Sequence, residues 1–171
     1  MASSFAKRLA AKAEDQYNKF HLYNEGDPPL SAQIKKYWQG LGLHFPGVGE
    51  QWSAVFVSWC IKSTGATAAE FKFAQRHAIF LKWAIKNSVD QVGLFRAHRI
   101  SQYSPSIGDI VVNNQPSGTY DYDYAASNDS YHSHSAIVTE RGQDKKGEYV
   151  LTVGGNESDS VRQKIIYLKN G

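Results

Sequence analysis

Hydrophobic residues in the first part of the chain recur every three or four positions, which is the spacing of one face of a helix. The pattern predicts an amphipathic helix over Phe5–Phe20, capped by Ser3 or Ser4. A second, shorter helix is expected to begin after a cap at Ser31 and to stop at Gly42. The N-terminal region is therefore predicted to be helical.

The run "WSAVFVSWCI", residues 52–61, is apolar on nearly every side. A helix without a polar face belongs in the interior, so this segment is predicted to be the buried central helix, ending near Gly65. An apolar stripe from Phe73 to Ile85 indicates a fourth helix.

The periodicity then changes to short β-branched runs separated by turn residues. These runs are "DIVVNN", "HSAIVTE", "EYVLTVG" and "RQKIIYLK". They predict antiparallel strands. Helices followed by strands indicate an α+β fold in which the buried central helix packs on an antiparallel sheet.

A long polar segment, "NNQPSGTYDYDYAASNDSYHS", separates the first two predicted strands. It is rich in Tyr, Asp, Ser and Asn and exceeds what a simple connection needs. Two interpretations stand side by side: a lid that faces a substrate, or a surface loop without a role.

Composition sets wide limits on function. A chain of 171 residues, 42% of them hydrophobic, is expected to fold as one domain over residues 1–171. Nineteen basic residues against 16 acidic ones give a net charge of +3 that is spread along the chain, so nucleic acid is not an expected partner.

Charges at Lys7, Arg8 and Lys12 interrupt any signal peptide, and no membrane span is expected. With one cysteine, an internal disulfide is excluded.

Two nucleophile candidates lie in the predicted central helix. Ser53 falls in its first turn, where unpaired N–H groups and the helix dipole favour a developing negative charge. A helix cap or a small packing residue is the alternative for Ser53. Cys60 lies about 10 Å further along the axis and is predicted to be an inert buried thiol.

Histidines offer a candidate base. His132 and His134 precede a predicted strand and, being two residues apart, could face one cleft. Together with His77 they could instead form a zinc site, and a surface position for His134 is a further alternative.

The stretch "VGGNESDSV" ends a predicted strand with two glycines. Asn156 or Glu157 could turn back from it and hold an imidazole in one tautomer. A plain Gly-Asn turn is the alternative.

Taken in order, W-S-A-V-F-V-S-W, S-P-S-I-G-D-I-V-V, H-S-A-I-V and G-G-N-E-S-D-S-V resemble the papain-like superfamily of cell-wall peptidases and amidases, the NlpC and CHAP group. The resemblance runs from about Tyr37 to Val161 and is closest to an uncharacterised bacterial branch. It implies a papain-like fold, with a helical part at residues 1–45 and a catalytic core at residues 46–171.

Carried over by position, the resemblance makes Ser53 the nucleophile and His134 the base. Asn156 becomes the orienting residue, with Glu157 as its substitute. The residues expected to bind substrate are Trp52, His132 and His77. Asp109 is expected to be a structural turn residue, and no cofactor or metal is needed.

Most of the superfamily has cysteine where this chain has Ser53. A serine keeps its proton until attack, whereas a Cys–His pair can exist as an ion pair. Three explanations follow: a native serine nucleophile, an engineered replacement that silences the enzyme, or a domain that only binds.

The expected function is hydrolysis of an amide bond in peptidoglycan, as an amidase or endopeptidase. One version is an antibacterial toxin made in the cytoplasm and delivered to the periplasm or cell wall by a secretion machine, with an immunity protein as partner. The alternative is a non-catalytic cell-wall-binding module that uses its tyrosine-rich loop.

Overall fold

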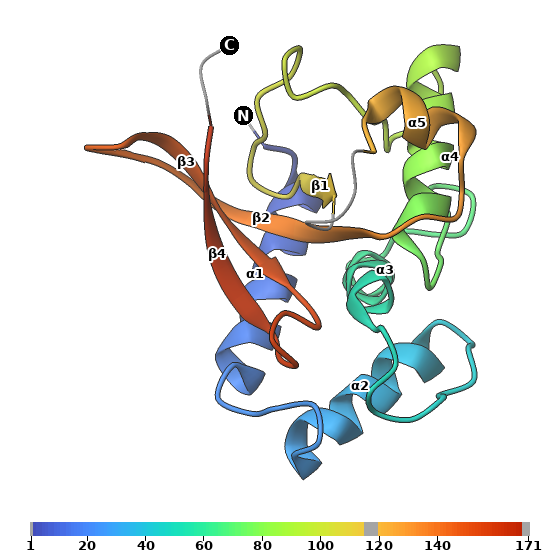
Figure 1. Ribbon diagram of the computed structural model, residues 1–171, viewed down its shortest axis with the longest axis vertical. Helices are drawn as coiled ribbons and strands as arrows, with labels where there is room; N and C mark the ends of the chain where they lie inside the picture. Colours follow the sequence, from blue (N-terminus) through green and yellow to red (C-terminus); the bar gives the residue numbers. More distant parts are fainter. Residues whose placement is uncertain (1, 115–119, 169–171) are drawn as a thin grey trace.

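The computed structural model describes residues 2–114 and 120–168 (Figure 1). Its helices are α1 (Ser4–Phe20), α2 (Pro28–Gly40), α3 (Ser53–Ser63), α4 (His77–Asp90) and α5 (Tyr122–Ser127). Its strands are β1 (Ile110–Asn114), β2 (Ser133–Asp144), β3 (Gly147–Gly154) and β4 (Arg162–Tyr167).

The four strands form one antiparallel sheet in the order β1-β2-β3-β4. This confirms the predicted α+β class and each of the four predicted strands. Asp109, which precedes β1, acts as the expected turn residue because its Oδ2 accepts a hydrogen bond from Ser106 N at 2.7 Å.

Residues at the first turns of α1 and α2 explain where these helices begin. Ser3 caps α1 as predicted, since its Oγ accepts from Ala6 N at 3.1 Å. Helix α2 begins at Pro28, one turn before the predicted cap at Ser31. A proline in the first turn loses nothing by lacking an N–H, because that group has no partner inside the helix.

Helix α4 begins at His77, four residues later than the apolar stripe suggested. The preceding segment is held against α3 instead. Ser58 Oγ donates to the carbonyl of Ala74 at 2.9 Å and lies 3.2 Å from Ala74 N. These contacts keep Phe73 and Ala74 outside the helix and place His77 at its first turn.

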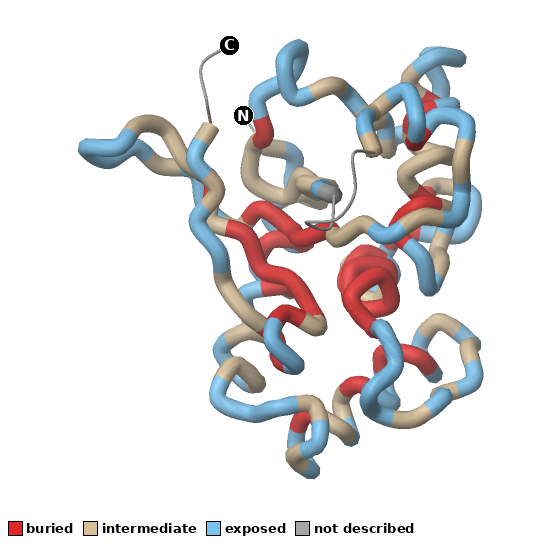
Figure 2. The backbone as a smooth tube through the Cα atoms, viewed as in Figure 1, coloured by how far each residue is buried: buried red, intermediate tan, exposed pale blue. Residues whose placement is uncertain are grey.

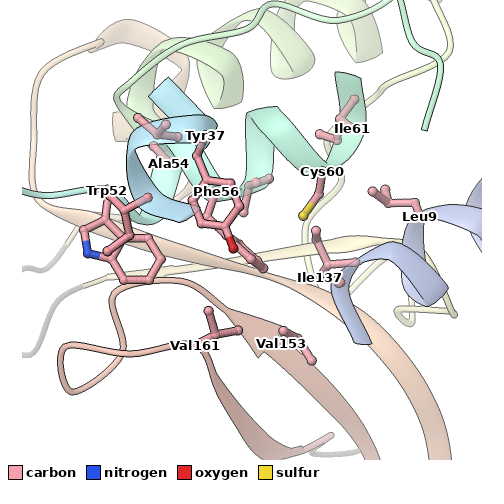
Figure 3. Packing of buried hydrophobic residues seen from close by; sticks show 14 of the residues in the cluster. Leu9, Tyr37, Trp52, Ala54, Phe56, Cys60, Ile61, Ile137, Val153 and Val161 are labelled. Atoms are coloured by element: carbon pink, nitrogen blue, oxygen red, sulfur yellow. The ribbon is translucent and has the colours of Figure 1, made fainter. Parts of the chain in front are cut away.

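Helix α3 lies at the centre of the core, as its apolar sequence predicted (Figure 2). Figure 3 shows Phe56 and Cys60 of α3 between Tyr37 of α2 and Ile137 and Val153 of the sheet. Leu9 of α1 belongs to the same cluster (Figure 3). The N-terminal helices thus share one core with α3 and the sheet.

The predicted lid segment contains the short helix α5. Residues 115–119 of the predicted lid segment lie outside the described part of the chain. The rings of Tyr120 and Tyr124 stack with centroids 4.6 Å apart, and Tyr131 packs against both. Among the helices described, none has the length and apolar character needed to cross a membrane.

Candidate active site

Ser53 is the first residue of α3, and the chain enters the helix through Trp52. The first backbone bond of the helix runs from Phe56 N to the Trp52 carbonyl at 2.9 Å. An indole cannot accept hydrogen bonds, so Trp52 does not cap the N–H groups of Ser53, Ala54 and Val55. These donors belong to the same first turn as Ser53, at the positive end of the helix dipole.

A hydrogen-bonded chain of three side chains crosses this helix start. Ser53 Oγ lies 2.6 Å from His77 Nε2, and Ser135 Oγ lies 2.6 Å from His77 Nδ1. All three residues are buried. They come from three elements, α3, α4 and β2, so tertiary packing alone brings them together.

The imidazole of His77 is neutral near pH 7. Burial, and to a smaller extent the neighbouring His134, lower its pKa to about 3. A neutral ring donates from one nitrogen and accepts at the other. His77 can therefore accept the Ser53 proton at Nε2 while its Nδ1–H donates to Ser135.

A second pair lies beside the first. His134 Nε2 contacts Glu157 Oε1 at 2.9 Å, and the His134 ring centroid lies 5.7 Å from that of His77. The absence of a side chain at Gly154 leaves room for this pair. A Cβ there would lie 2.2 Å from Glu157 Oε1 and 3.0 Å from His134 Nε2.

Glu157 is buried but charged. Burial raises the pKa of its carboxyl, yet hydrogen bonds from His134 and Lys164 outweigh that effect and hold the pKa below its ordinary value. Lys164 Nζ lies 2.6 Å from Glu157 Oε2. The site therefore contains an ionised carboxylate next to two imidazoles.

The predicted pairing of Ser53 with His134 needs correction. Among the described residues, the imidazole hydrogen-bonded to Ser53 belongs to His77, and His134 is the neighbouring ring, with its centroid 5.7 Å from that of His77. The reason is the late start of α4, which presents the His77 side chain to the start of α3.

The side chain hydrogen-bonded to His134 Nε2 is that of Glu157, which was the predicted substitute for Asn156. Asn156 adopts a left-handed conformation with φ of 57°, so the chain turns sharply there and brings the next side chain inward. Gly155 packs directly on α3, which anchors the turn beside Trp52 and Phe56.

The three residues predicted to bind substrate, Trp52, His132 and His77, lie in three different environments. Trp52 is fully buried and its Nε1 donates to Glu25 Oε2 at 2.9 Å, so it serves the core and presents no surface to a substrate. His132 is exposed, whereas His77 lies inside the site. In the described ranges no group of three or more His, Cys, Asp or Glu side chains could hold a metal ion.

Cys60 is fully buried among core residues, and burial raises the pKa of its thiol. It lies outside the Ser53 site, in agreement with the prediction that it is inert.

The sequence did not indicate that Ser135 and Lys164 would lie at the site. Ser135 follows His134 directly, so alternation along a strand separates their side chains, and nothing in "HSHSAIV" marks it as a partner of a distant histidine. Lys164 lies in an ordinary strand of mixed polarity. The register Thr152↔Lys164 between β3 and β4 brings it near Glu157.

A cavity of about 1110 Å³ lies between α4, β1, α5 and the loop that follows α4. Ser53, His77 and His134 do not line it. Phe80 links the two regions, because it lines the cavity and its ring centroid is 5.6 Å from that of His77.

Comparison with known families finds a match to the family described as "Uncharacterized protein conserved in bacteria (DUF2272)", over residues 25–171. Because the match covers most of the chain, the protein belongs to this family. Searches of curated proteins and of solved structures found no match.

Proposed function

We propose that this member of the DUF2272 family hydrolyses an amide bond of bacterial peptidoglycan and that Ser53 is its nucleophile. The observation that carries the proposal is the 2.6 Å contact between Ser53 Oγ and His77 Nε2 at the uncapped start of α3. A hydroxyl, a base and unpaired N–H groups in one place are the parts that acyl transfer needs.

In the first step, Ser53 Oγ attacks the carbonyl carbon while its proton passes to His77 Nε2. Ser135 Oγ contacts the opposite ring nitrogen, and in the tautomer that carries its proton on Nδ1 this hydroxyl accepts a hydrogen bond and leaves Nε2 free to accept the Ser53 proton. The N–H groups of the first turn of α3 stabilise the oxyanion of the tetrahedral intermediate. The proton on His77 then returns to the leaving amine, and an acyl-enzyme remains.

His134 and Glu157 serve the second half of the reaction. The carboxylate accepts from His134 Nε2 and leaves Nδ1 free to take a proton from the water that attacks the acyl-enzyme. The bond between the acyl carbon and Ser53 Oγ then breaks, the proton passes to Ser53 Oγ, and the acid product leaves. The negative charge of Glu157 also opposes the cost of forming an imidazolium on the buried His77 ring, one imidazole away.

The buried base also suits serine better than cysteine. A Cys–His ion pair requires a stable imidazolium, which the low pKa of His77 opposes. Neutral imidazole can still accept a hydrogen bond from a hydroxyl. This argument favours Ser53 as the native nucleophile over an engineered replacement.

The substrate class rests on the resemblance of the ordered motifs to NlpC and CHAP enzymes. The α+β arrangement supports it, since the helix that carries Ser53 packs against an antiparallel sheet whose second strand carries a histidine. A papain-like fold is accordingly part of the proposal.

Purified sacculi test the substrate class. We expect the wild-type chain to release peptides or new amino groups from sacculi, and Ser53→Ala to release none. Ser53→Cys separates a native serine site from a silenced cysteine enzyme, because only the latter would gain activity. If neither wild type nor Ser53→Cys yields product, wall hydrolysis is refuted. Saturable binding of all three forms without product would instead indicate a binding module.

Ser135→Ala tests the tautomer argument. Loss of one buried hydrogen bond of about 1 kcal/mol should lower kcat/KM by about 5-fold to 10-fold. Ser133→Ala is the matched control, since it lies two residues earlier on β2 and its Oγ has no hydrogen-bond partner among the described residues. Equal effects of the two substitutions would contradict a role for Ser135.

A further inference from the structure

Glu157 makes two polar contacts, one through each carboxylate oxygen. Oε1 lies 2.9 Å from His134 Nε2, and Oε2 lies 2.6 Å from Lys164 Nζ. The Glu157 side chain is only 3% exposed, while that of Lys164 is 61% exposed. A buried carboxylate requires compensation, and here one of its two partners reaches in from the surface.

Strand pairing sets the position of Lys164. It lies opposite Thr152 in the β3–β4 register, and Thr152 Oγ1 donates to the Lys164 carbonyl at 3.2 Å. The turn between these strands carries Glu157, whose backbone N donates to the Ser160 carbonyl at 3.0 Å. Both ends of the ion pair are therefore anchored by backbone hydrogen bonds.

We propose that Lys164 is a positioning residue for the His134–Glu157 pair: its ammonium group holds Oε2 of Glu157, so that Oε1 stays charged and directed at His134. The inference deepens the proposed function and rests on it for the role of His134. Lys164 touches neither the nucleophile nor the proposed base of Ser53.

The other titratable and charged groups near this turn do not contact the Glu157 carboxylate in the described part of the chain. Arg162 of β4 donates to the His21 carbonyl at 2.7 Å, and Glu25 accepts from Trp52. The ring of His77 of α4 lies next to that of His134, and its low pKa keeps it neutral. Asp159, in the same turn as Glu157, is exposed. Lys164 is thus the cation that contacts the Glu157 carboxylate from β4.

The sign of the effect follows from this geometry. Lys164 favours the charged form of Glu157 and helps to hold its pKa below the ordinary value. Without the lysine, that pKa rises, and the carboxylate becomes protonated at a higher pH as the solution is acidified. His134 then loses its anionic partner over part of the acidic range where the wild type keeps it.

The experiment measures the titration of the Glu157 carboxyl by carbon NMR in wild type, Lys164→Met and Lys164→Arg. We expect an upward shift of the Glu157 midpoint in Lys164→Met and restoration in Lys164→Arg. Lys145→Met is the matched control, because it removes an exposed lysine with no ion pair recorded in the described structure. In activity assays, the acid limb of kcat/KM should move upward in Lys164→Met while the alkaline limb stays in place.

The two readouts separate this inference from the proposed function. An unchanged Glu157 titration in a folded Lys164→Met protein overturns the role of Lys164, whatever the activity. A shifted titration in a protein that cleaves nothing supports the role of Lys164 and refutes the hydrolase. If Lys164→Met fails to fold, Lys164→Gln is measured in its place against the same two criteria.

Discussion

A fluorophosphonate probe should label Ser53 in the wild-type protein, and His77→Ala should lower the labelling rate by about 10²-fold to 10⁴-fold, the usual effect of removing a general base. Labelling forms the Ser53 Oγ–P bond, expels fluoride and transfers the hydroxyl proton to the base. His77 is the imidazole in contact with Ser53 Oγ, at 2.6 Å. The measurement is the rate of mass increase on the peptide that contains Ser53.

The matched comparison is His134→Ala. Its imidazole is hydrogen-bonded to Glu157 and forms no hydrogen bond with Ser53 among the described residues, so its loss should lower the labelling rate far less than the loss of His77 does. Ser53→Ala should abolish labelling of this peptide. The probe makes the test independent of the natural substrate. Fast labelling of His77→Ala together with slow labelling of His134→Ala would restore the base assignment that the resemblance implied.

The sequence predicted the central parts of this arrangement because they depend on local patterns. An apolar run without a polar face must be buried, and α3 is. β-Branched runs between turn residues became the four strands. Ser53 was predictable as a candidate because its position at a helix start follows from the same local pattern.

The histidine that contacts Ser53 was not predictable in the same way. It depends on where α4 begins, which Ser58 decides from a different helix by binding the backbone of Ala74. Likewise, the contact of His134 with Glu157, and not with Asn156, depends on the left-handed backbone at Asn156 and on the close packing of Gly155. These are tertiary effects, which hydrophobic periodicity does not record.

Gly155→Ala is expected to destabilise the fold by about 2 kcal/mol, the typical cost of overpacking a core. A Cβ at this position would lie 2.6 Å from Phe56 Cβ and 2.6 Å from Trp52 Cζ3. Both side chains are fully buried in the core cluster, where interiors are close-packed, so neither can move aside freely (Figure 3). For a domain of this size, the cost corresponds to a fall in Tm of about 4 to 8 °C.

The same substitution should also disturb the site, because the turn that holds Gly155 carries Glu157 toward His134. Gly26→Ala is the control: it lies in an exposed connection, and a Cβ there meets nothing within 4 Å. Thermal unfolding followed by circular dichroism gives both Tm values. Equal Tm values for the two variants would show that α3 tolerates a side chain at Gly155. In that case, the close approach of the β3–β4 turn to α3 could not be what positions Glu157.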